Sequence, residues 1–282
     1  MMQIYTVNQH KMYLDSKDSL NLASGQVFEP DEVELVKKHI KQGDVVIDIG
    51  ANIGYYTLLF AQLVGETGRV IAFEPDPDNF ELLHKNVSLN QYHNVTLIQK
   101  AVASENSQAP LFLCDENKGM HRLYDSVCCQ TSIEVETVCL DDYLPTLVNK
   151  VNFVKIDIEG AEYNALQGMQ NILRQQQPKL LTEFSPAALF EYGIEPQTYI
   201  DFLSQLGFDL YQVGEQLHLI NLEKLDIDLK LVNQIMQDLL PKLKHKSSMP
   251  DVVEAVLQQL EQQNYPRPLV ENFLCIAKGN TL

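Results

Sequence analysis

Short apolar runs alternate with amphipathic stretches along most of the chain. VVIDI, at 45–49, is a run of mostly β-branched residues, and apolar side chains then recur from Ile53 to Val64 at the three- and four-residue spacing of a helix. The same succession returns several times. The expected strands are 45–49, 69–74, 95–102, 151–157 and 178–184, with helices that start near residues 53, 77, 159 and 197. This alternation predicts βα units that form a mostly parallel sheet with helices on both of its faces.

Two segments depart from this alternation. Residues 103–150 are polar and rich in turns, with two strand-like pieces, and they predict a β-hairpin or an irregular excursion over one end of the sheet. Residues 222–268 contain two helical stretches joined by the basic loop KLKHKSSMP, and we expect a helical insertion that serves as a lid, a subunit contact or a surface layer. The last apolar run, 270–278, predicts a strand that rejoins the sheet beside 208–214.

Composition and charge narrow the range of partners. With 282 residues, of which 45% are hydrophobic, the chain can bury a substantial core. A formal net charge of −17 disfavours DNA, RNA and anionic membranes, because each of them attracts proteins of the opposite charge. The start of the chain lacks the features of a secretory signal, no apolar run approaches the roughly 20 residues of a membrane span, and the five irregularly spaced cysteines fit reduced thiols. We therefore expect a soluble, cytoplasmic protein with a small-molecule partner.

The stretch VVIDIGANIG (45–54) is the first candidate ligand site. A strand that runs through a glycine turn into a helix places backbone N–H groups at the carboxyl end of a parallel sheet, where open α/β folds bind ligands. A dinucleotide fingerprint requires a glycine where this chain has Asn52, and Asp48 would repel a pyrophosphate but suits an amine. Glu74 closes the second strand, where a carboxylate can accept both hydroxyl hydrogens of a ribose. An amine site followed by a ribose site matches S-adenosylmethionine.

Three motifs, taken in order, resemble a known family. VIDIGANIGYYT, VIAFEPDPDNFELLHKNVSLN and VKIDIEGAE together resemble the FkbM family of S-adenosylmethionine-dependent methyltransferases, and the final NFLCIAK is similar to the closing strand of that family. The resemblance implies a class I methyltransferase (Rossmann-like) sheet whose last strand is inserted antiparallel. It also implies methylation of a hydroxyl oxygen, most often on a sugar or on a secondary metabolite such as a polyketide or peptide natural product.

Carried over position by position, the resemblance implies a cofactor site. The first turn would surround the methionine end of S-adenosylmethionine, the end of the second strand would hold the ribose, and the turn after the third strand would lie near the adenine. The residues concerned are Asp48, Gly50, Asn52, Gly54, Glu74 and Ala101.

The resemblance extends over about residues 40–220, and together with the pattern of the remaining residues we expect one methyltransferase domain with four parts. These are an N-terminal cap (1–43), a cofactor-binding core (44–221), the helical insertion (222–268) and the closing strand (269–282).

Methyl transfer to an alcohol requires an aligned oxygen and a group that helps the hydroxyl to lose its proton. Asp157 ends the fourth strand and Glu183 ends the fifth, so both carboxylates can reach one crevice, as a base or as ligands of a divalent metal. No ligand spacing in the sequence supports a metal, and we predict no metal ligands. His121, in the excursion 103–150, is a third candidate base because imidazole accepts protons near neutral pH.

Two other functions stay open on the sequence alone. One is a nicotinamide-dependent oxidoreductase, which Asp48 and Asn52 disfavour, and the other is a cofactor-binding scaffold that has lost catalysis. The motifs specify neither the methyl acceptor nor the oligomeric state, and a dimer is compatible with them.

Overall fold

The computed structural model describes most of the chain. The described residues are 3–239, apart from Ser16, Ser19, 115–116, 127–128 and Gln130, together with 254–255, 258–259, 262 and 272–280.

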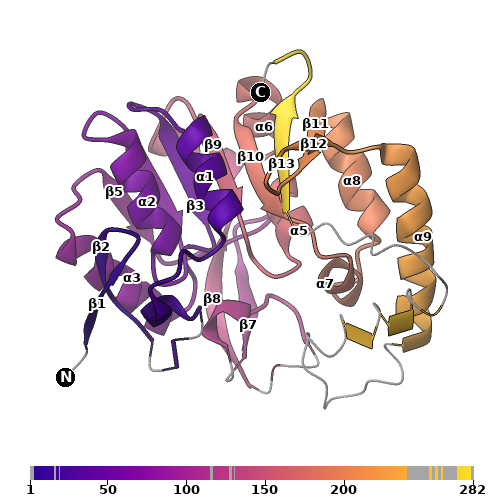
Figure 1. Cartoon of the computed structure of the whole chain (residues 1–282), viewed down its shortest axis with the longest axis horizontal. Helices are drawn as coiled ribbons and strands as arrows, with labels where there is room; N and C mark the ends of the chain where they lie inside the picture. Colours follow the sequence, from indigo (N-terminus) through magenta and orange to yellow (C-terminus); the bar gives the residue numbers. More distant parts are fainter. Residues whose placement is uncertain are drawn as a thin grey trace.

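The central feature is an eight-stranded sheet with the order β12-β11-β13-β10-β9-β3-β4-β5 (Figure 1). Its strands are β3 (Val45–Ile49), β4 (Arg69–Phe73), β5 (Val95–Ile98), β9 (Phe153–Ile156), β10 (Lys179–Glu183), β11 (Phe208–Gln212), β12 (His218–Leu219) and β13 (Asn272–Ala277). The pairs from β10 through β9, β3 and β4 to β5 are parallel, whereas β13 lies antiparallel between β10 and β11. This topology confirms the predicted class I methyltransferase sheet and the return of the last strand beside β11.

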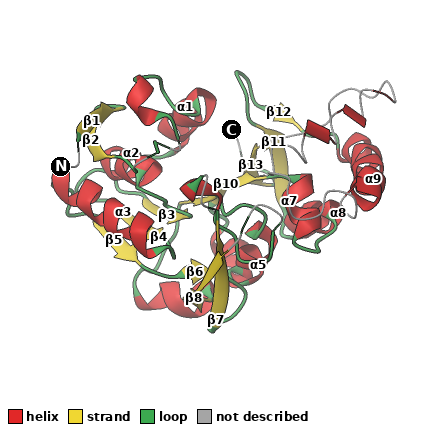
Figure 2. Cartoon of the chain, turned by 90° about the horizontal axis from the view of Figure 1, so that it is seen from below, coloured by secondary structure: helices red, strands yellow, loops and turns green. Residues whose placement is uncertain are grey.

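Helices cover both faces of the sheet, as the βα pattern predicts (Figure 2). In β3, Val46 packs with α1, α2 and α3, while Ile47 and Ile49 pack on the opposite face with α5, α6 and α8. The two faces differ because successive side chains of a strand point to opposite sides. The helices are α1 (Pro30–His39), α2 (Tyr55–Val64), α3 (Pro77–Leu89), α5 (Glu162–Gln167), α6 (Gln170–Gln176), α7 (Pro186–Glu191), α8 (Pro196–Gln205) and α9 (Leu222–Leu239).

Two expected elements are each divided in the structure. The strand expected at 95–102 ends at Ile98, and Ala101–Val102 forms β6, which pairs with β8 outside the main sheet. The helix expected at 159–173 is interrupted at Gly168. A Cβ at Gly168 would lie 2.0 Å from the carbonyl oxygen of Ala103, so the backbone of 103–104 packs directly on this point of the chain. The strand and the helix are therefore both interrupted by tertiary contacts, not by the secondary-structure propensity of their residues.

The excursion predicted at 103–150 is built around an antiparallel pair of strands. β7 (Gln108–Leu113) and β8 (Thr131–Val138) pair with each other, and with β6 they make a three-stranded sheet that lies beyond one end of the main sheet (Figure 1). This confirms the predicted hairpin. Short helical turns complete this part and the cap: η1 (Leu22–Ser24), η2 (Lys118–Met120), α4 (Leu140–Tyr143) and η3 (Leu144–Thr146).

The C-terminal insertion is described only in part. α9 packs beside α7 and α8, and the basic loop KLKHKSSMP and most of the second predicted helical stretch lie outside the described residues. Among the described helices, none combines the length and the apolar character that crossing a membrane requires.

The N-terminal cap begins with the hairpin of β1 (Ile4–Val7) and β2 (His10–Tyr13), which packs on α3. One fully buried side chain joins the two. Asn86 accepts a hydrogen bond from the backbone N–H of Tyr13 at 2.7 Å, and its amide donates to the carbonyl oxygens of Tyr13 at 3.0 Å and Ile53 at 2.8 Å. Asn86 therefore ties the hairpin to α3 and to the loop before α2, and Asn90 adds two hydrogen bonds to Lys11 of the same hairpin.

Replacing this asparagine is expected to destabilise the protein. Asn86→Ala removes three hydrogen bonds from backbone groups, one buried and two partly buried, and the free energy of unfolding should fall by about 3 kcal/mol, at roughly 1 kcal/mol for each hydrogen bond. Urea unfolding followed by circular dichroism measures the change. The exposed Ser88 on the same helix provides the control, and a Ser88→Ala variant as unstable as Asn86→Ala would contradict this account.

Candidate active site

A cavity of about 630 Å³ lies at the carboxyl ends of the parallel strands. Its wall includes the loop after β3, the end of β4, the start of β6, and the ends of β9 and β10. The N-terminal cap adds Leu20, Phe28 and Glu29, and the excursion adds residues 117–121. This volume lies within the range of about 300 to 1,000 Å³ that is typical of small-molecule sites.

The loop after β3 adopts a backbone that its sequence favours. Gly50 has a φ of 83°, and a Cβ there would lie 2.0 Å from the carbonyl oxygen of Asp157, so only glycine allows this contact between the β3 loop and the end of β9. Asn52 also lies in the left-handed region, with a φ of 49°, and asparagine tolerates that region better than most residues do. Its backbone N–H donates to Oε2 of Glu74 at 2.8 Å.

Glu74 is held rigidly at the wall of the cavity. Its second carboxylate oxygen accepts the backbone N–H of Asp76 at 2.9 Å, and the residue is 6% exposed. The pKa of Glu74 is raised to about 8, mainly by burial and to a smaller extent by the charges of Asp76 and Asp48, against the lowering effect of the two backbone amides. Each carboxylate oxygen has a further acceptor position, so a hydroxyl pair can still donate to this group.

The structure separates the six predicted cofactor residues into two groups. Those that line the cavity are Gly50, Asn52, Glu74 and Ala101, whereas Asp48 and Gly54 lie behind the loop. Gly54 is the N-cap residue of helix α2. A Cβ there would lie 2.8 Å from Cδ1 of Leu83, so this glycine allows α2 and α3 to pack closely.

Asp48 faces α2 instead of the cavity. It is 1% exposed, and the Thr57 hydroxyl donates to its Oδ2 at 2.5 Å. Burial raises the pKa of Asp48 to about 6, against the opposing effects of the Lys155 ammonium and the Thr57 hydroxyl. This placement does not support direct contact of Asp48 with an amine of the ligand, because β3 directs it to the same face as Val46.

The residues around Glu74 fit S-adenosylmethionine. Glu74 offers a fixed acceptor for the ribose hydroxyls, and Ala101, Leu111 and Leu123 form an apolar wall beside it that suits a purine ring. Gly50, Ala51 and Asn52 also line the cavity, and the amides of Gly50 and Ala51 donate to the carbonyl oxygen of Phe73 at 3.1 and 3.0 Å. A buried acceptor next to an apolar wall is what a nucleoside requires.

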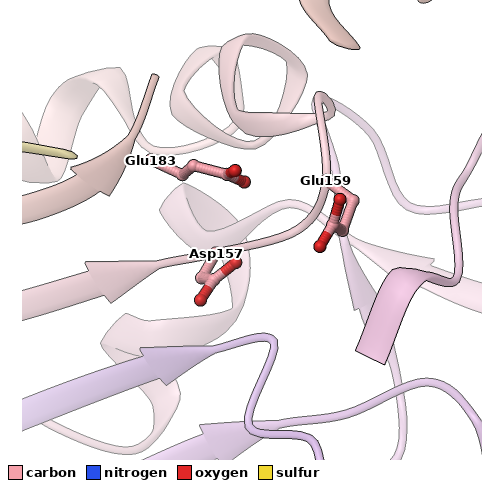
Figure 3. A group of neighbouring side chains, drawn as sticks. All are labelled: Asp157, Glu159 and Glu183. Carbon is pink, nitrogen blue, oxygen red and sulfur yellow. The ribbon is translucent and has the colours of Figure 1, made fainter. Parts of the chain in front are cut away.

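Three carboxylates meet at the ends of β9 and β10 (Figure 3). Asp157, Glu159 and Glu183 each offer one oxygen within 4.8 Å of the others, and all three line the cavity. Glu159 has a left-handed φ of 56° in the tight turn after β9. The structure thus brings together the two predicted carboxylates, Asp157 and Glu183, and adds Glu159 to them.

Two buried cations balance part of this negative charge. Lys155 Nζ lies 2.8 Å from Oδ2 of Asp157, and Arg122 Nη2 lies 3.2 Å from Oε2 of Glu159. Arg122 also lies 3.4 Å from Glu191 on α7, which fixes the excursion to that helix. Burial, together with the charges of the other acidic residues, raises the pKa of Glu183 well above its ordinary value.

Lys155 also contacts the N-terminal cap. Its ammonium lies 4.5 Å from the ring centroid of Tyr56, and the Tyr56 hydroxyl donates to Glu29 at 2.8 Å and contacts Glu32 at 3.2 Å. The amide of Asn272, in β13, donates to Glu32. Burial lowers the pKa of Lys155, but the surrounding carboxylates, first of all Asp157, raise it by more, so the lysine stays charged.

His121 lines the cavity, but both of its ring nitrogens face protein groups. The backbone N–H of Cys114 donates to Nδ1 at 3.0 Å, and Nε2 lies 3.9 Å from Oδ2 of Asp76. In the neutral ring the proton must therefore be on Nε2, and the lone pair of Nδ1 is already used. A base needs a lone pair directed at its substrate, so this placement does not support His121 as the catalytic base.

Sequence reasoning missed the contribution of the N-terminal cap. Phe28 and Glu29 belong to no motif, and only the tertiary structure brings them to the cavity.

The sequence does contain an indication of the role of Lys155. This residue lies in VKIDIEGAE, two residues before Asp157, and a lysine inside an apolar strand predicts a buried acidic partner. Glu162 has a structural role, because it accepts the backbone N–H groups of Ile158 and Gly160.

Comparison with known proteins gives consistent matches. Residues 48–210 match the family model "Methyltransferase FkbM domain". Hexuronic acid methyltransferase AglP of Haloferax volcanii is 30% identical over 152 residues, which cover 52% of this chain and 58% of AglP. Methyltransferase 1 of Beauveria bassiana is 28% identical over 171 residues, which cover 50% of this chain and 68% of that protein.

A solved structure of an FkbM methyltransferase from Methylobacillus flagellatus aligns with a TM-score of 0.42 and 16% identity, over 65% of this chain and 47% of that chain. The alignment with AglP spans little more than half of that protein. The family model, by contrast, covers more than half of the present chain and includes the loop after β3, Glu74 and the three carboxylates. The chain belongs to the FkbM methyltransferase family.

Proposed function

We propose that this protein is an S-adenosylmethionine-dependent O-methyltransferase that acts on a hydroxyl group of a sugar or secondary metabolite. One observation carries the proposal: a single cavity contains both the nucleoside-type site around Glu74 and the carboxylates Asp157, Glu159 and Glu183. Family membership supports methyl transfer, and the name of AglP shows that one relative methylates a hexuronic acid.

The β3 loop and the end of β4 would hold the cofactor. Glu74 accepts the ribose hydroxyls, the wall at Ala101 borders the adenine, and the backbone from Gly50 to Asn52 faces the methionine portion. When bound, S-adenosylmethionine supplies an electrophilic methyl group on a positively charged sulfur. The task of the protein is to hold an acceptor oxygen in line with that group and to exclude water.

The carboxylates at the ends of β9 and β10 would act on the acceptor hydroxyl. An alcohol keeps its proton at neutral pH, so its oxygen becomes a good nucleophile only when a base takes the proton or a bound cation weakens the O–H bond. Asp157 forms an ion pair with Lys155, while Oε2 of Glu183 has no hydrogen-bond partner among the residues that the structure describes. Glu183 is therefore the group of this cluster most able to assist the hydroxyl, directly or through a cation.

The two alternative functions are less well supported. A nicotinamide dinucleotide needs loop amides that face its pyrophosphate, yet the Asn52 amide donates to the buried carboxylate of Glu74. A scaffold without catalysis would not need three carboxylates at the cavity wall. Incubating the purified protein with methyl-labelled S-adenosylmethionine and a metabolite extract separates these functions. A product that has gained one labelled methyl group on oxygen supports the proposal, and cofactor binding without transfer to any acceptor supports the scaffold.

Removal of the Glu74 carboxylate is expected to weaken cofactor binding. Glu74→Ala deletes the acceptor of the ribose hydroxyls, and a hydrogen bond to a charged group contributes about 1.5 to 3 kcal/mol, so the affinity for S-adenosylhomocysteine should fall about 10- to 100-fold. Calorimetric titration at pH 9, where most of the Glu74 carboxyl group is ionised, measures this affinity. Glu81→Ala, an exposed carboxylate on the adjacent helix α3, is the control and should bind like the wild type. Equal affinities in all three proteins would exclude this ribose site.

Nucleoside binding should strengthen as the pH rises. Because burial raises the pKa of Glu74 to about 8, the free protein carries mostly the neutral acid at pH 7, whereas the ribose hydroxyls bind best to the carboxylate. The affinity for adenosine, which has no group that titrates in this range, should rise about tenfold from pH 7 to pH 9. A Glu74→Ala variant should show no such increase, and a wild-type affinity that falls over this range would contradict the assignment.

Glu183 is expected to affect turnover more than cofactor binding. With the acceptor found in the labelling experiment, Glu183→Gln should lower the rate of methyl transfer at least about 100-fold, the lower end of what a group assisting proton transfer contributes. Affinity for S-adenosylhomocysteine should stay within about twofold of the wild type, because Glu183 lies outside the β3 loop. Glu66→Gln, an exposed site beyond α2, is the charge-matched control. An unchanged rate would remove Glu183 from the mechanism.

A further inference from the structure

We infer that Asp157, Glu159 and Glu183 bind a divalent cation at the wall of the cavity. The inference rests on the proposed function, because it concerns the same carboxylates, and it states how they act. Oxygen ligands alone are characteristic of Mg²⁺, Ca²⁺ and Mn²⁺.

The spacing of the three carboxylates suits one ion. Their nearest ligand oxygens all lie within 4.8 Å of one another. Two oxygens on opposite sides of a Ca²⁺ ion are about 5 Å apart, twice a Ca²⁺–O distance of about 2.4 Å, and a smaller ion needs only small side-chain shifts. Figure 3 shows the three side chains, from the turn after β9 and the end of β10, pointing toward a common space.

Glu183 provides an independent indication of a missing partner. The residue as a whole is partly buried, but its carboxyl group is enclosed, and Oε2 has no accessible surface and no hydrogen bond within the described part of the chain. A buried carboxylate oxygen without a partner costs about 1 to 3 kcal/mol or more, so such groups are normally paired. This oxygen belongs to the side chain that points at Asp157 and Glu159 (Figure 3). A cation in that space would supply the partner.

The neighbouring basic side chains do not replace such a cation. Lys155 Nζ lies 2.8 Å from Oδ2 of Asp157, and Arg122 Nη2 lies 3.2 Å from Oε2 of Glu159. No ion pair reaches Glu183 among the described residues. Arg122 is also shared with Glu191, so four acidic side chains gather around two basic ones, and a divalent cation is stabilised electrostatically beside such an acidic cluster.

The cavity gives this ion access to the acceptor. All three carboxylates line its wall, so water or an acceptor hydroxyl can complete the coordination shell from the cavity. A cation-bound hydroxyl loses its proton to solvent more readily than a free one. Its oxygen then forms the new bond to the methyl carbon as the bond from that carbon to the sulfur breaks and S-adenosylhomocysteine leaves. The carboxylates then act as ligands that position the acceptor.

Direct titration of the full-length protein with Mn²⁺ tests the inference without any turnover. Electron paramagnetic resonance of free Mn²⁺ should show one saturable site per wild-type chain, from which Mg²⁺ or Ca²⁺ displaces the probe. Glu183→Gln should weaken Mn²⁺ binding at least about tenfold, because even groups beyond the direct ligands often contribute 10- to 100-fold to metal affinity. Glu66→Gln loses the same charge at an exposed site far along the sequence and should bind Mn²⁺ like the wild type.

Three results would overturn the cation site: no saturable binding by the wild type, equal weakening in Glu183→Gln and Glu66→Gln, or unchanged binding in Glu183→Gln. Circular dichroism of each variant shows whether it is folded, and Asp157→Asn provides a second variant if Glu183→Gln is not. The proposed function is tested separately from the cation site. If the protein binds no Mn²⁺ and methyl transfer persists in EDTA, the cation site is excluded and the methyltransferase activity is supported. If the protein binds Mn²⁺ but transfers no methyl group to any acceptor, the cation site is supported and the proposed activity is not.

Discussion

The buried ammonium group of Lys155 stabilises the charged carboxylates in the wall of the cavity. It lies 2.8 Å from the Asp157 carboxylate and 4.5 Å from the Tyr56 ring centroid, and the charges of Glu29 and Glu32 also act on it. Buried carboxylates without a nearby cation would take up protons, because desolvation and mutual repulsion both disfavour their charged forms. The N-terminal cap, β9 and β13 all meet around this one lysine.

The contact between Gly50 and the Asp157 carbonyl joins the two halves of the site. It brings the β3 loop, which belongs to the nucleoside end, directly against the turn that carries the carboxylates. Parallel strands end at the same edge of the sheet. The last residues of β3, β4, β9 and β10 therefore all lie at the edge that borders the cavity. A fixed distance between the two ends favours methyl transfer, which depends on alignment more than on strong chemical groups.

The alternating pattern was sufficient to predict the strands and their parallel arrangement, because buried parallel strands and amphipathic helices have different periods. The expected strand ends then identified Glu74, Asp157 and Glu183 as candidate site residues, and all three line the cavity. The prediction for Asp48 assumed that a carboxylate next to a glycine turn faces the ligand. In the structure its strand position directs it under α2, and the sequence does not say which face of β3 that helix covers. His121 was proposed from its chemistry, but Cys114 and Asp76 face its two nitrogens.

The sequence alone determined the fold class, the family and the strand ends that carry the chemistry, because these follow from local periodicity and from contiguous motifs. Only the tertiary structure decided which side chains share the cavity. Glu29 comes from a cap with no motif, and Arg122, in the excursion, reaches Glu159 at the cavity wall through a contact distant in sequence. The tertiary structure also places the Glu183 carboxyl group beside Asp157 and Glu159, where its Oε2 has no hydrogen-bond partner in the described part of the chain.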